Sequence, residues 1–297
     1  MGVAKGYISA GITVLFWSFT MIWSKILLEE CFTPFSLLIT RLALAWIVLW
    51  IIRPKVLAFS GWRNEVPYML CGVFGVTLYF LAEYHALTFT MASNVGILTS
   101  ISPILTALIV WALYKERPNK MFVLGFFLAM AGVVLVSFNG EYGLEFNAPG
   151  LILCLVGAFL WALYSVAMRN TGRAPEGVEA PDMLMVTRRI FFWGLVGMLV
   201  CLPFMGFELN ADALFTPTVL GNLACSVLLA SAVGYVTWNI AMKSLGVVRA
   251  SMFTLAIPAL TVFEAAIILG EPITPVALIG VALIIGGLFV SQYLNRD

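Results

Sequence analysis

The sequence predicts an all-α integral membrane protein in which ten transmembrane helices form two inverted five-helix repeats around a central cavity. The first observation is composition: 62% of the 297 residues are hydrophobic and only 10% are charged, against about 45–50% and about 25% in soluble domains. The second is a series of apolar blocks of membrane-spanning length, and the third is a pattern that recurs between the two halves of the chain. A soluble enzyme, a nucleic-acid-binding protein and a secreted disulfide scaffold are therefore poor interpretations.

Ten apolar blocks account for most of the chain. A bilayer core about 30 Å thick requires about 20 apolar residues in a helix. Blocks near that length cover residues 7–28, 35–52, 66–87, 92–114, 120–138, 149–169, 183–205, 218–241, 249–269 and 275–293. The links between them are short and polar, so none could hold a soluble catalytic domain. The first block closely follows Lys5 and lacks a small-residue cleavage site, which favours a retained membrane helix over a cleaved signal peptide.

Basic residues in the links predict how the chain is oriented, because cytoplasmic loops of membrane proteins are enriched in Lys and Arg. With the N-terminus in the cytoplasm, the basic residues of the links fall on the cytoplasmic side, except Lys25. The acidic residues Glu208 and Asp212 then fall outside. We therefore expect an even number of spans in the plasma membrane, with both termini in the cytoplasm.

The second half of the chain repeats the first. Matched positions are Trp17 and Trp161, Arg41 and Arg188, Pro103 and Pro258, and Glu116 and Glu271. Their offset is 144 residues in the first helix, 147 in the second and 155 from the third onward. We place the first repeat at residues 1–140 and the second at 141–297, as one unit with no soluble domain. Because each repeat has an odd number of helices, the second enters the membrane from the opposite side, an architecture typical of secondary transporters.

A proline interrupts a predicted helix at the same place in each repeat. Pro103 and Pro258 lack an amide hydrogen, and each frees the carbonyl four residues earlier, which belongs to Thr99 or Thr254. A free carbonyl in lipid needs a partner. We therefore expect these four residues to form hinges that gate a path or contact a substrate, with a fixed structural kink as an equally good interpretation.

Aromatic and polar residues lie deep in four of the predicted helices. Trp17 lies about ten residues into its helix, roughly 15 Å deep by helical rise, which is too deep for an interfacial aromatic belt. Tyr79 and Glu83, like Tyr235 and Asn239, are four residues apart and share a helix face. The predicted substrate-binding set is Trp17, Tyr79, Glu83, His85, Trp161, Tyr164, Tyr235, Trp238 and Asn239. Such groups suit a zwitterion with an apolar side chain; the competing interpretation is interhelical packing and hydrogen bonding.

Arg41, Arg188 and Glu264 are charged residues predicted to lie inside the membrane. A charge at mid-membrane costs about 2.5–3.5 kcal/mol on insertion scales, so Glu264 must be protonated, paired or directed into the cavity. The two arginines lie closer to helix ends, where long side chains reach the interface, and we expect both to be structural anchors. Glu83 and His85 lie near the outer end of their helix, where either could carry a proton or simply be hydrated.

Glycines recur in the fifth and tenth predicted helices. They occupy positions 125, 132, 280, 286 and 287. Small residues let helix backbones approach closely in lipid. These two helices are therefore expected to pack at the periphery or to form a homodimer interface.

Both halves end in the same motif, a proline followed 13 residues later by a glutamate, then a second proline and a glycine-rich last helix. Its two copies are Pro103…Glu116-Arg117-Pro118 and Pro258…Glu271-Pro272. The paired motif resembles the drug/metabolite transporter superfamily, in particular its EamA-type ten-helix exporters, over nearly the whole chain. Residues 15–18, 157–164 and 238–239 also resemble bacterial aromatic amino-acid exporters. The resemblance implies export of small metabolites from the cytoplasm across a bacterial inner membrane.

The leading hypothesis is a secondary transporter that exports amino acids, with aromatic or other apolar side chains, by alternating access. The alternative is an exporter of another small metabolite or of a drug-like cation. No cofactor and no metal site are expected, and the sequence has no G-x-x-x-x-G-K-[ST] loop for ATP. An enzyme is not expected, because there is one histidine and no H-E-x-x-H motif, and a channel fits less well. The expected partners are amino-acid substrates and the lipid bilayer, with no nucleic acid.

Overall fold

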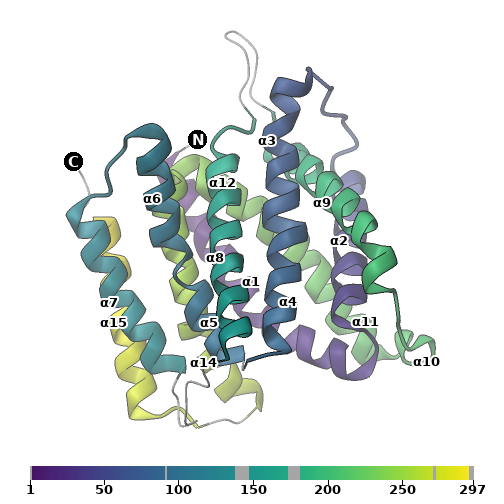
Figure 1. Ribbon diagram of the computed structural model, residues 1–297. Helices are drawn as coiled ribbons and strands as arrows, with labels where there is room; N and C mark the ends of the chain where they lie inside the picture. The colour runs from purple at the N-terminus through teal and green to yellow at the C-terminus, as the bar shows by residue number, and fades with distance from the viewer. Residues whose placement is uncertain (1, 91, 138–146, 173–180, 270–271, 294–297) are drawn as a thin grey trace.

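The computed structural model describes residues 2–90, 92–137, 147–172, 181–269 and 272–293, which form a bundle of long helices (Figure 1). Ten helical spans are long and apolar enough to cross a membrane. Strand pairing within the described residues is limited to one isolated bridge between Phe32 and Leu209. The predicted all-α fold with ten transmembrane helices is therefore confirmed.

Six of the ten spans are single helices, because a helix satisfies every backbone amide and carbonyl locally in lipid. They are α1 (Val3–Glu30), α2 (Pro34–Ile52), α7 (Lys120–Ser137), α8 (Ala148–Met168), α9 (Met183–Met205) and α15 (Pro275–Tyr293). A short helix, α10 (Ala211–Leu214), lies in the link that follows α9.

The other four spans are interrupted helices, and their interruptions match between the repeats. The third span contains α3 (Trp62–Gly72), the π-helix η1 (Val73–Leu78) and α4 (Tyr79–Leu87), and the eighth contains α11 (Pro217–Cys225), the π-helix η2 (Ser226–Val233) and α12 (Gly234–Leu245). The fourth span contains α5 (Ala92–Thr99) and α6 (Ser102–Tyr114), and the ninth contains α13 (Val247–Ser251), the 3₁₀ helix η3 (Met252–Ala256) and α14 (Ile257–Leu269). The 155-residue offset maps η1 into η2.

Both predicted proline interruptions are present. Thr99 ends α5 and Pro103 lies in the first turn of α6, so the span breaks at residues 100 and 101. In the second repeat Thr254 lies in η3 and Pro258 lies in the first turn of α14. A proline in a first turn removes no helical hydrogen bond, which explains why each helix restarts there. Their role as hinges stays a prediction, and Glu271 of the repeated motif lies outside the described residues.

α7 and α15 pack side by side at one edge of the bundle (Figure 1). A Cβ atom at Gly132 would lie 2.4 Å from the carbonyl oxygen of Gly280, and one at Gly287 would lie 2.5 Å from the backbone nitrogen of Ala129. The two backbones therefore touch, and glycine is required at these positions. A homodimer through these helices, which stays a prediction, must use their other faces.

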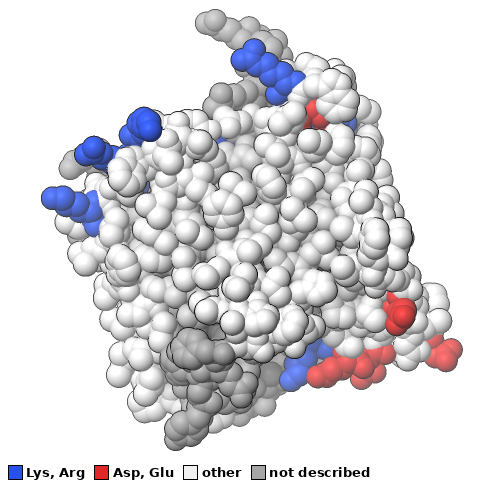
Figure 2. All heavy atoms as spheres, viewed as in Figure 1, with Lys and Arg blue, Asp and Glu red and all other residues white. Residues whose placement is uncertain are grey.

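On the face that Figure 2 shows, charged side chains gather at the two ends of the bundle and leave a wide uncharged belt between them. Figure 1 places the link after α2 and the α6–α7 link at one end of the bundle; their sequences contain Arg53 and Lys55, and Arg117, so we call it the basic end. The link after α9, whose sequence contains Glu208 and Asp212, lies at the opposite, acidic end (Figure 1). The belt coincides with the apolar spans, so the chain is an integral membrane protein. Which end faces the cytoplasm stays a prediction.

Candidate substrate-binding site

Six aromatic side chains from both repeats meet inside the bundle. This aromatic cluster consists of Trp17, Tyr79, Trp161, Tyr164, Tyr235 and Trp238. Trp17 and Trp161, the pair related by the repeat, have ring centroids 5.5 Å apart, and Tyr79 lies 5.0 Å from Trp161. Favourable aromatic contacts have centroids about 4.5–7 Å apart. The fold therefore brings together predicted residues from α1, α4, α8 and α12.

The two π-helical segments hold the aromatic cluster in place. The indole Nε1 of Trp17 donates to the carbonyl of Ala230 at 3.0 Å, and the hydroxyl of Tyr235 donates to the carbonyl of Gly75 at 3.4 Å. Gly75 lies in η1 and Ala230 lies in η2, at positions that the 155-residue offset relates. A π-helix loosens the regular backbone ladder and is frequent at functional sites. Sequence reasoning missed both segments, since no proline marks either of them.

A buried polar layer, formed by Tyr164, Thr187 and Asn239, borders the aromatic cluster on the side of the basic end. The hydroxyl of Tyr164 donates to Oδ1 of Asn239 at 2.7 Å, and Nδ2 of Asn239 donates to Oγ1 of Thr187 at 2.9 Å. All three residues are fully buried. A Cβ atom at Gly75 would lie 2.4 Å from Cγ of Tyr164, so only glycine leaves room for this ring. Sequence reasoning did not single out Thr187 as part of the site.

Two groups of opposite charge border the aromatic cluster on its other side. The hydroxyl of Tyr79 donates to Oε1 of Glu83 at 2.9 Å, in agreement with their shared helix face. The guanidinium carbon of Arg41, on α2, lies 5.4 Å from the ring centroid of Phe80, which lies 5.0 Å from that of Tyr79. Arg41 is only 5% exposed and interacts electrostatically with Glu83. A cation and a carboxylate therefore face the same region of the bundle.

Three other predicted residues make different contacts. His85 is exposed near the end of α4. Glu264 of α14 is buried, and its Oε1 accepts a hydrogen bond of 2.5 Å from the hydroxyl of Ser18. Arg188 donates to two backbone carbonyls of the link after α2. Glu264 thus joins α14 to α1, and Arg188 joins α9 to the link after α2.

A partly buried ion pair that the sequence did not reveal joins α3 to α9. Nε of Arg189 donates to Oε1 of Glu65 at 2.6 Å, and its Nη2 donates to Oε2 at 2.9 Å. The indole Nε1 of Trp193 also donates to Oε1 of Glu65 at 2.6 Å. Paired hydrogen bonds between a guanidinium and a carboxylate are strong and geometrically specific. Glu65 precedes the apolar block that begins at residue 66, so hydropathy gave no reason to expect it inside the bundle.

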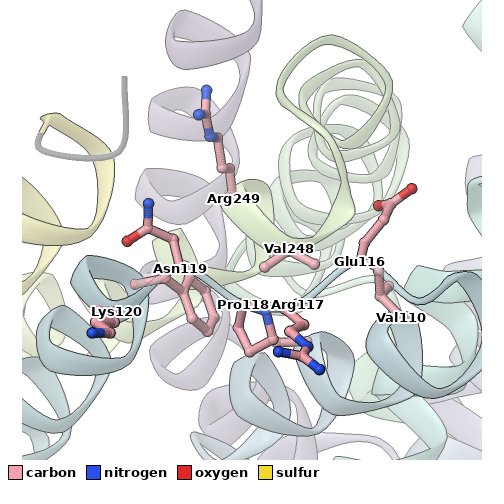
Figure 3. Close-up of a pocket in the computed structure, with 10 residues that line it drawn as sticks. Val110, Glu116, Arg117, Pro118, Asn119, Lys120, Val248 and Arg249 are labelled. Carbon is pink, nitrogen blue, oxygen red and sulfur yellow. The ribbon is translucent and has the colours of Figure 1, made fainter. Parts of the chain in front are cut away.

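A cavity of about 600 Å³ opens at the basic end, between α6, the α6–α7 link, α7 and α13. Figure 3 shows the guanidinium groups of Arg117 and Arg249 extending in opposite directions from it. Glu116, on its lining, accepts hydrogen bonds of 2.8 and 2.6 Å from Arg169, and these bonds hold the pKa of the Glu116 carboxyl below its usual value. This cavity shares no lining residue with the aromatic cluster. The cluster, all six of whose residues belong to the predicted substrate-binding set, is the candidate site.

The fold and the site together define a membrane transporter, with ten spans, two matched repeats and an aromatic and polar centre between them. The chain belongs to the EamA-like transporter family, whose sequence model matches residues 4–138 and 148–293. The expected membership of the drug/metabolite transporter superfamily is confirmed. The closer resemblance to aromatic amino-acid exporters stays a prediction.

Similar proteins agree with this assignment. The chain is 28% identical over 294 residues to an uncharacterized transporter of Archaeoglobus fulgidus, covering 97% of each chain. It is 27% identical over 307 residues to an uncharacterized transporter of Clostridium kluyveri, covering 98% of this chain and 94% of that one. A crystal structure of a protein with 21% sequence identity matches 99% of each chain with a TM-score of 0.79, which supports the fold. Both sequence relatives are described as transporters, and neither description names a substrate.

Proposed function

We propose that this protein is a secondary transporter of the bacterial inner membrane, with cytoplasmic termini, that exports amino acids with aromatic or other apolar side chains by alternating access. The observation that carries the proposal is the aromatic cluster, built from both repeats and bordered by charged and polar groups. An amino acid of this class presents matching groups: an apolar ring, an ammonium and a carboxylate.

The aromatic cluster suits a planar apolar side chain. The ring centroid of Trp161 lies 5.5 Å from that of Trp17 and 5.0 Å from that of Tyr79. Each aromatic contact that a substrate ring makes among them contributes roughly 0.5–1.5 kcal/mol beyond the burial of area. Because the indole donor of Trp17 is already bonded to the backbone, its contribution to binding comes from the ring itself.

The polar layer supports a conformation that is closed at the basic end. Tyr164 and Asn239 are fully buried, whereas Tyr79 and Glu83 are partly exposed. A substrate in this conformation reaches the aromatic cluster from the acidic end, which is extracellular in the proposed orientation. Rocking of one repeat against the other separates Tyr164 from Asn239 and opens the path to the cytoplasm.

A drug-like organic cation is the second candidate substrate. Glu83 accepts a hydrogen bond from Tyr79, whose ring contacts Trp161. Aromatic faces beside a carboxylate also suit ammonium cations. Only the amino acid carries a carboxylate. Comparing transport of an amino acid with transport of the amine formed by its decarboxylation therefore distinguishes the two candidate substrates.

The test is counterflow in proteoliposomes that contain the purified full-length protein and an unlabelled internal substrate. Uptake of labelled tryptophan, phenylalanine, leucine, lysine and tryptamine is compared with uptake by protein-free liposomes. We expect tryptophan and phenylalanine to exchange fastest and to compete with each other. Trp161→Ala should slow this exchange, and Trp111→Ala, at an exposed position on α6, should leave it unchanged.

Two outcomes contradict the proposal in different ways. If no amino acid moves faster than through protein-free liposomes, the protein does not transport amino acids. If tryptamine exchanges and tryptophan does not, the substrate is an organic cation.

A further inference from the structure

Two arginines that the internal repeat relates have different surroundings. Arg188 donates to the backbone carbonyls of Arg53 and Lys55, and its guanidinium carbon lies 3.5 Å from the ring centroid of Trp50. Arg41, its counterpart in the first repeat, has only the ring of Phe80 at 5.4 Å. Within the residues that the structure describes, no hydrogen bond or ion pair engages the Arg41 guanidinium. One repeat therefore has an anchored arginine, and the other has an arginine whose guanidinium makes no hydrogen bond or ion pair with a described residue.

The isolation of Arg41 is costly for the transporter by itself. Its side chain carries five N–H donors and a permanent charge, and the residue is only 5% exposed. A charge held largely out of water without hydrogen bonds is destabilising, and a ring 5.4 Å away satisfies none of the donors. No Arg41 nitrogen is among the fully buried side-chain atoms of the described residues that lack a partner, so its donors keep some exposure through which a small molecule can reach them. Such an arrangement is expected where a ligand supplies the missing partner.

A carboxylate of the protein lies near Arg41 without neutralising it. Glu83 interacts electrostatically with Arg41, and the two do not form an ion pair among the described salt bridges. One oxygen of Glu83 instead accepts the hydroxyl of Tyr79. Opposite charges held apart at low dielectric attract strongly, so a molecule with both charges gains from lying between them.

An α-amino acid has this charge distribution, with its ammonium and its carboxylate on one carbon atom. Its side chain then extends from the space between the charges into the aromatic cluster. Tyr79 connects the two regions, because its hydroxyl bonds Glu83 and its ring lies 5.0 Å from that of Trp161. The charges and the rings are therefore contiguous, and the partly exposed Tyr79 and Glu83 lie where they meet.

We propose that Arg41 is the residue that binds the substrate carboxylate, through paired hydrogen bonds from its guanidinium, while Glu83 accepts the substrate ammonium. This inference rests on the proposed function. It adds the residue that recognises the carboxylate, which is the group that distinguishes an amino acid from an amine. Planar paired bonding to a carboxylate is the chemistry for which arginine is suited and lysine is not.

The test compares the binding of tryptophan and of tryptamine, which has the same ring and ammonium and no carboxylate. Competition against labelled tryptophan is measured on the purified full-length wild-type protein and on Arg41→Gln, Arg41→Lys and Arg188→Gln. Arg188→Gln is the matched control, because it removes the repeat-related guanidinium that the backbone already binds. Size-exclusion elution and melting temperature verify that each variant is folded.

We expect Arg41→Gln to weaken tryptophan binding by about 10- to 100-fold, the loss of a charge-assisted pair of hydrogen bonds. Tryptamine binding should be unchanged or tighter, since a nearby positive charge has been removed. Arg41→Lys keeps the charge and loses the planar geometry, so its preference for tryptophan over tryptamine should lie between wild type and Arg41→Gln. Arg188→Gln should leave that preference as in wild type.

Other results overturn the inference. Equal losses for both compounds in Arg41→Gln show a structural role, and no loss for either shows that Arg41 does not contact substrate. If Arg41→Gln does not fold, Arg41→Lys provides the test. A preference for tryptophan over tryptamine that is as strong in Arg41→Lys as in wild type contradicts the inference. Wild-type protein that binds neither tryptophan nor any other amino acid contradicts the proposed function as well, and is thereby distinguished from a failure at Arg41 alone.

Discussion

Removing the Tyr164 hydroxyl tests whether the polar layer is the closed gate at the basic end. Tyr164→Phe keeps the ring, which lies 5.0 Å from that of Trp161, and deletes the 2.7 Å hydrogen bond to Asn239. Interhelical hydrogen bonds in membrane proteins contribute about 0.6–2 kcal/mol. If this bond exists only in the closed conformation, the open-to-closed ratio rises by about 3- to 30-fold. The same change applied to Tyr7, which has no role in the site, is a control.

A native thiol reports on this opening. Cys71 is fully buried, and its Sγ lies 3.8 Å from the backbone carbonyl of Tyr164. The rate at which a small thiol reagent modifies Cys71, followed by mass spectrometry, should rise in Tyr164→Phe by a similar factor. Cys154, which is also fully buried, should keep its wild-type rate. A parallel rise at both cysteines, or no rise at Cys71, would refute the gating role of the layer.

Three further changes test the packing and charges around the site. Gly287→Ala places a Cβ atom 2.5 Å from the α7 backbone and should cost roughly 1–3 kcal/mol of stability. The control Gly286→Ala, whose Cβ atom has its nearest contact at 3.7 Å, should keep the wild-type Tm. Equal Tm values for the two variants would contradict the close packing of α7 and α15. Glu65→Gln removes the carboxylate that Arg189 binds and should cost about 1.5–3 kcal/mol, so an unchanged Tm in the purified protein would show that this pair does not stabilise the bundle. Glu116→Gln removes the ion pair with Arg169, which holds the pKa of the Glu116 carboxyl below the usual 4.5. The stability that this pair contributes is present above pH 4.5 and is lost as the pH falls through the lowered pKa, so the small Tm difference between wild type and Glu116→Gln should disappear in acid. A Tm difference that grows in acid would contradict the pairing.

Hydropathy predicted the spans because lipid leaves the backbone few alternatives to a helix. The block at residues 35–52 corresponds to α2 (Pro34–Ile52), and the end of the block at 66–87 corresponds to the end of α4. The third span begins earlier than predicted, at Trp62, because its first turn is polar. Apolar blocks indicate where the chain crosses lipid, and they do not indicate how far a helix continues beyond it.

The internal repeat and the four-residue spacing predicted much of the candidate site. The meeting of Trp17 with Trp161 follows from their matched positions, and the contact of Tyr79 with Glu83 follows from their shared face. The π-helices and Thr187 were missed, because they depend on which side chains other helices present to them. Local sequence patterns carry no information about such contacts.

Arg41 and Arg188 show the same limit most clearly. The repeat places them at equivalent positions, and both were expected to be structural anchors. The link after α2 supplies carbonyl partners to Arg188, and no described residue hydrogen-bonds to Arg41. The difference arises from where a loop lies in space, which the matched helix sequences do not encode.

A structure of the full-length protein with bound tryptophan tests the central claim most directly. The account predicts density for one tryptophan at the aromatic cluster, with its indole against Trp17 and Trp161 and its carboxylate at Arg41. Tryptophan in the basic-end cavity beside Arg117 and Arg249, with the aromatic cluster unoccupied, would contradict it.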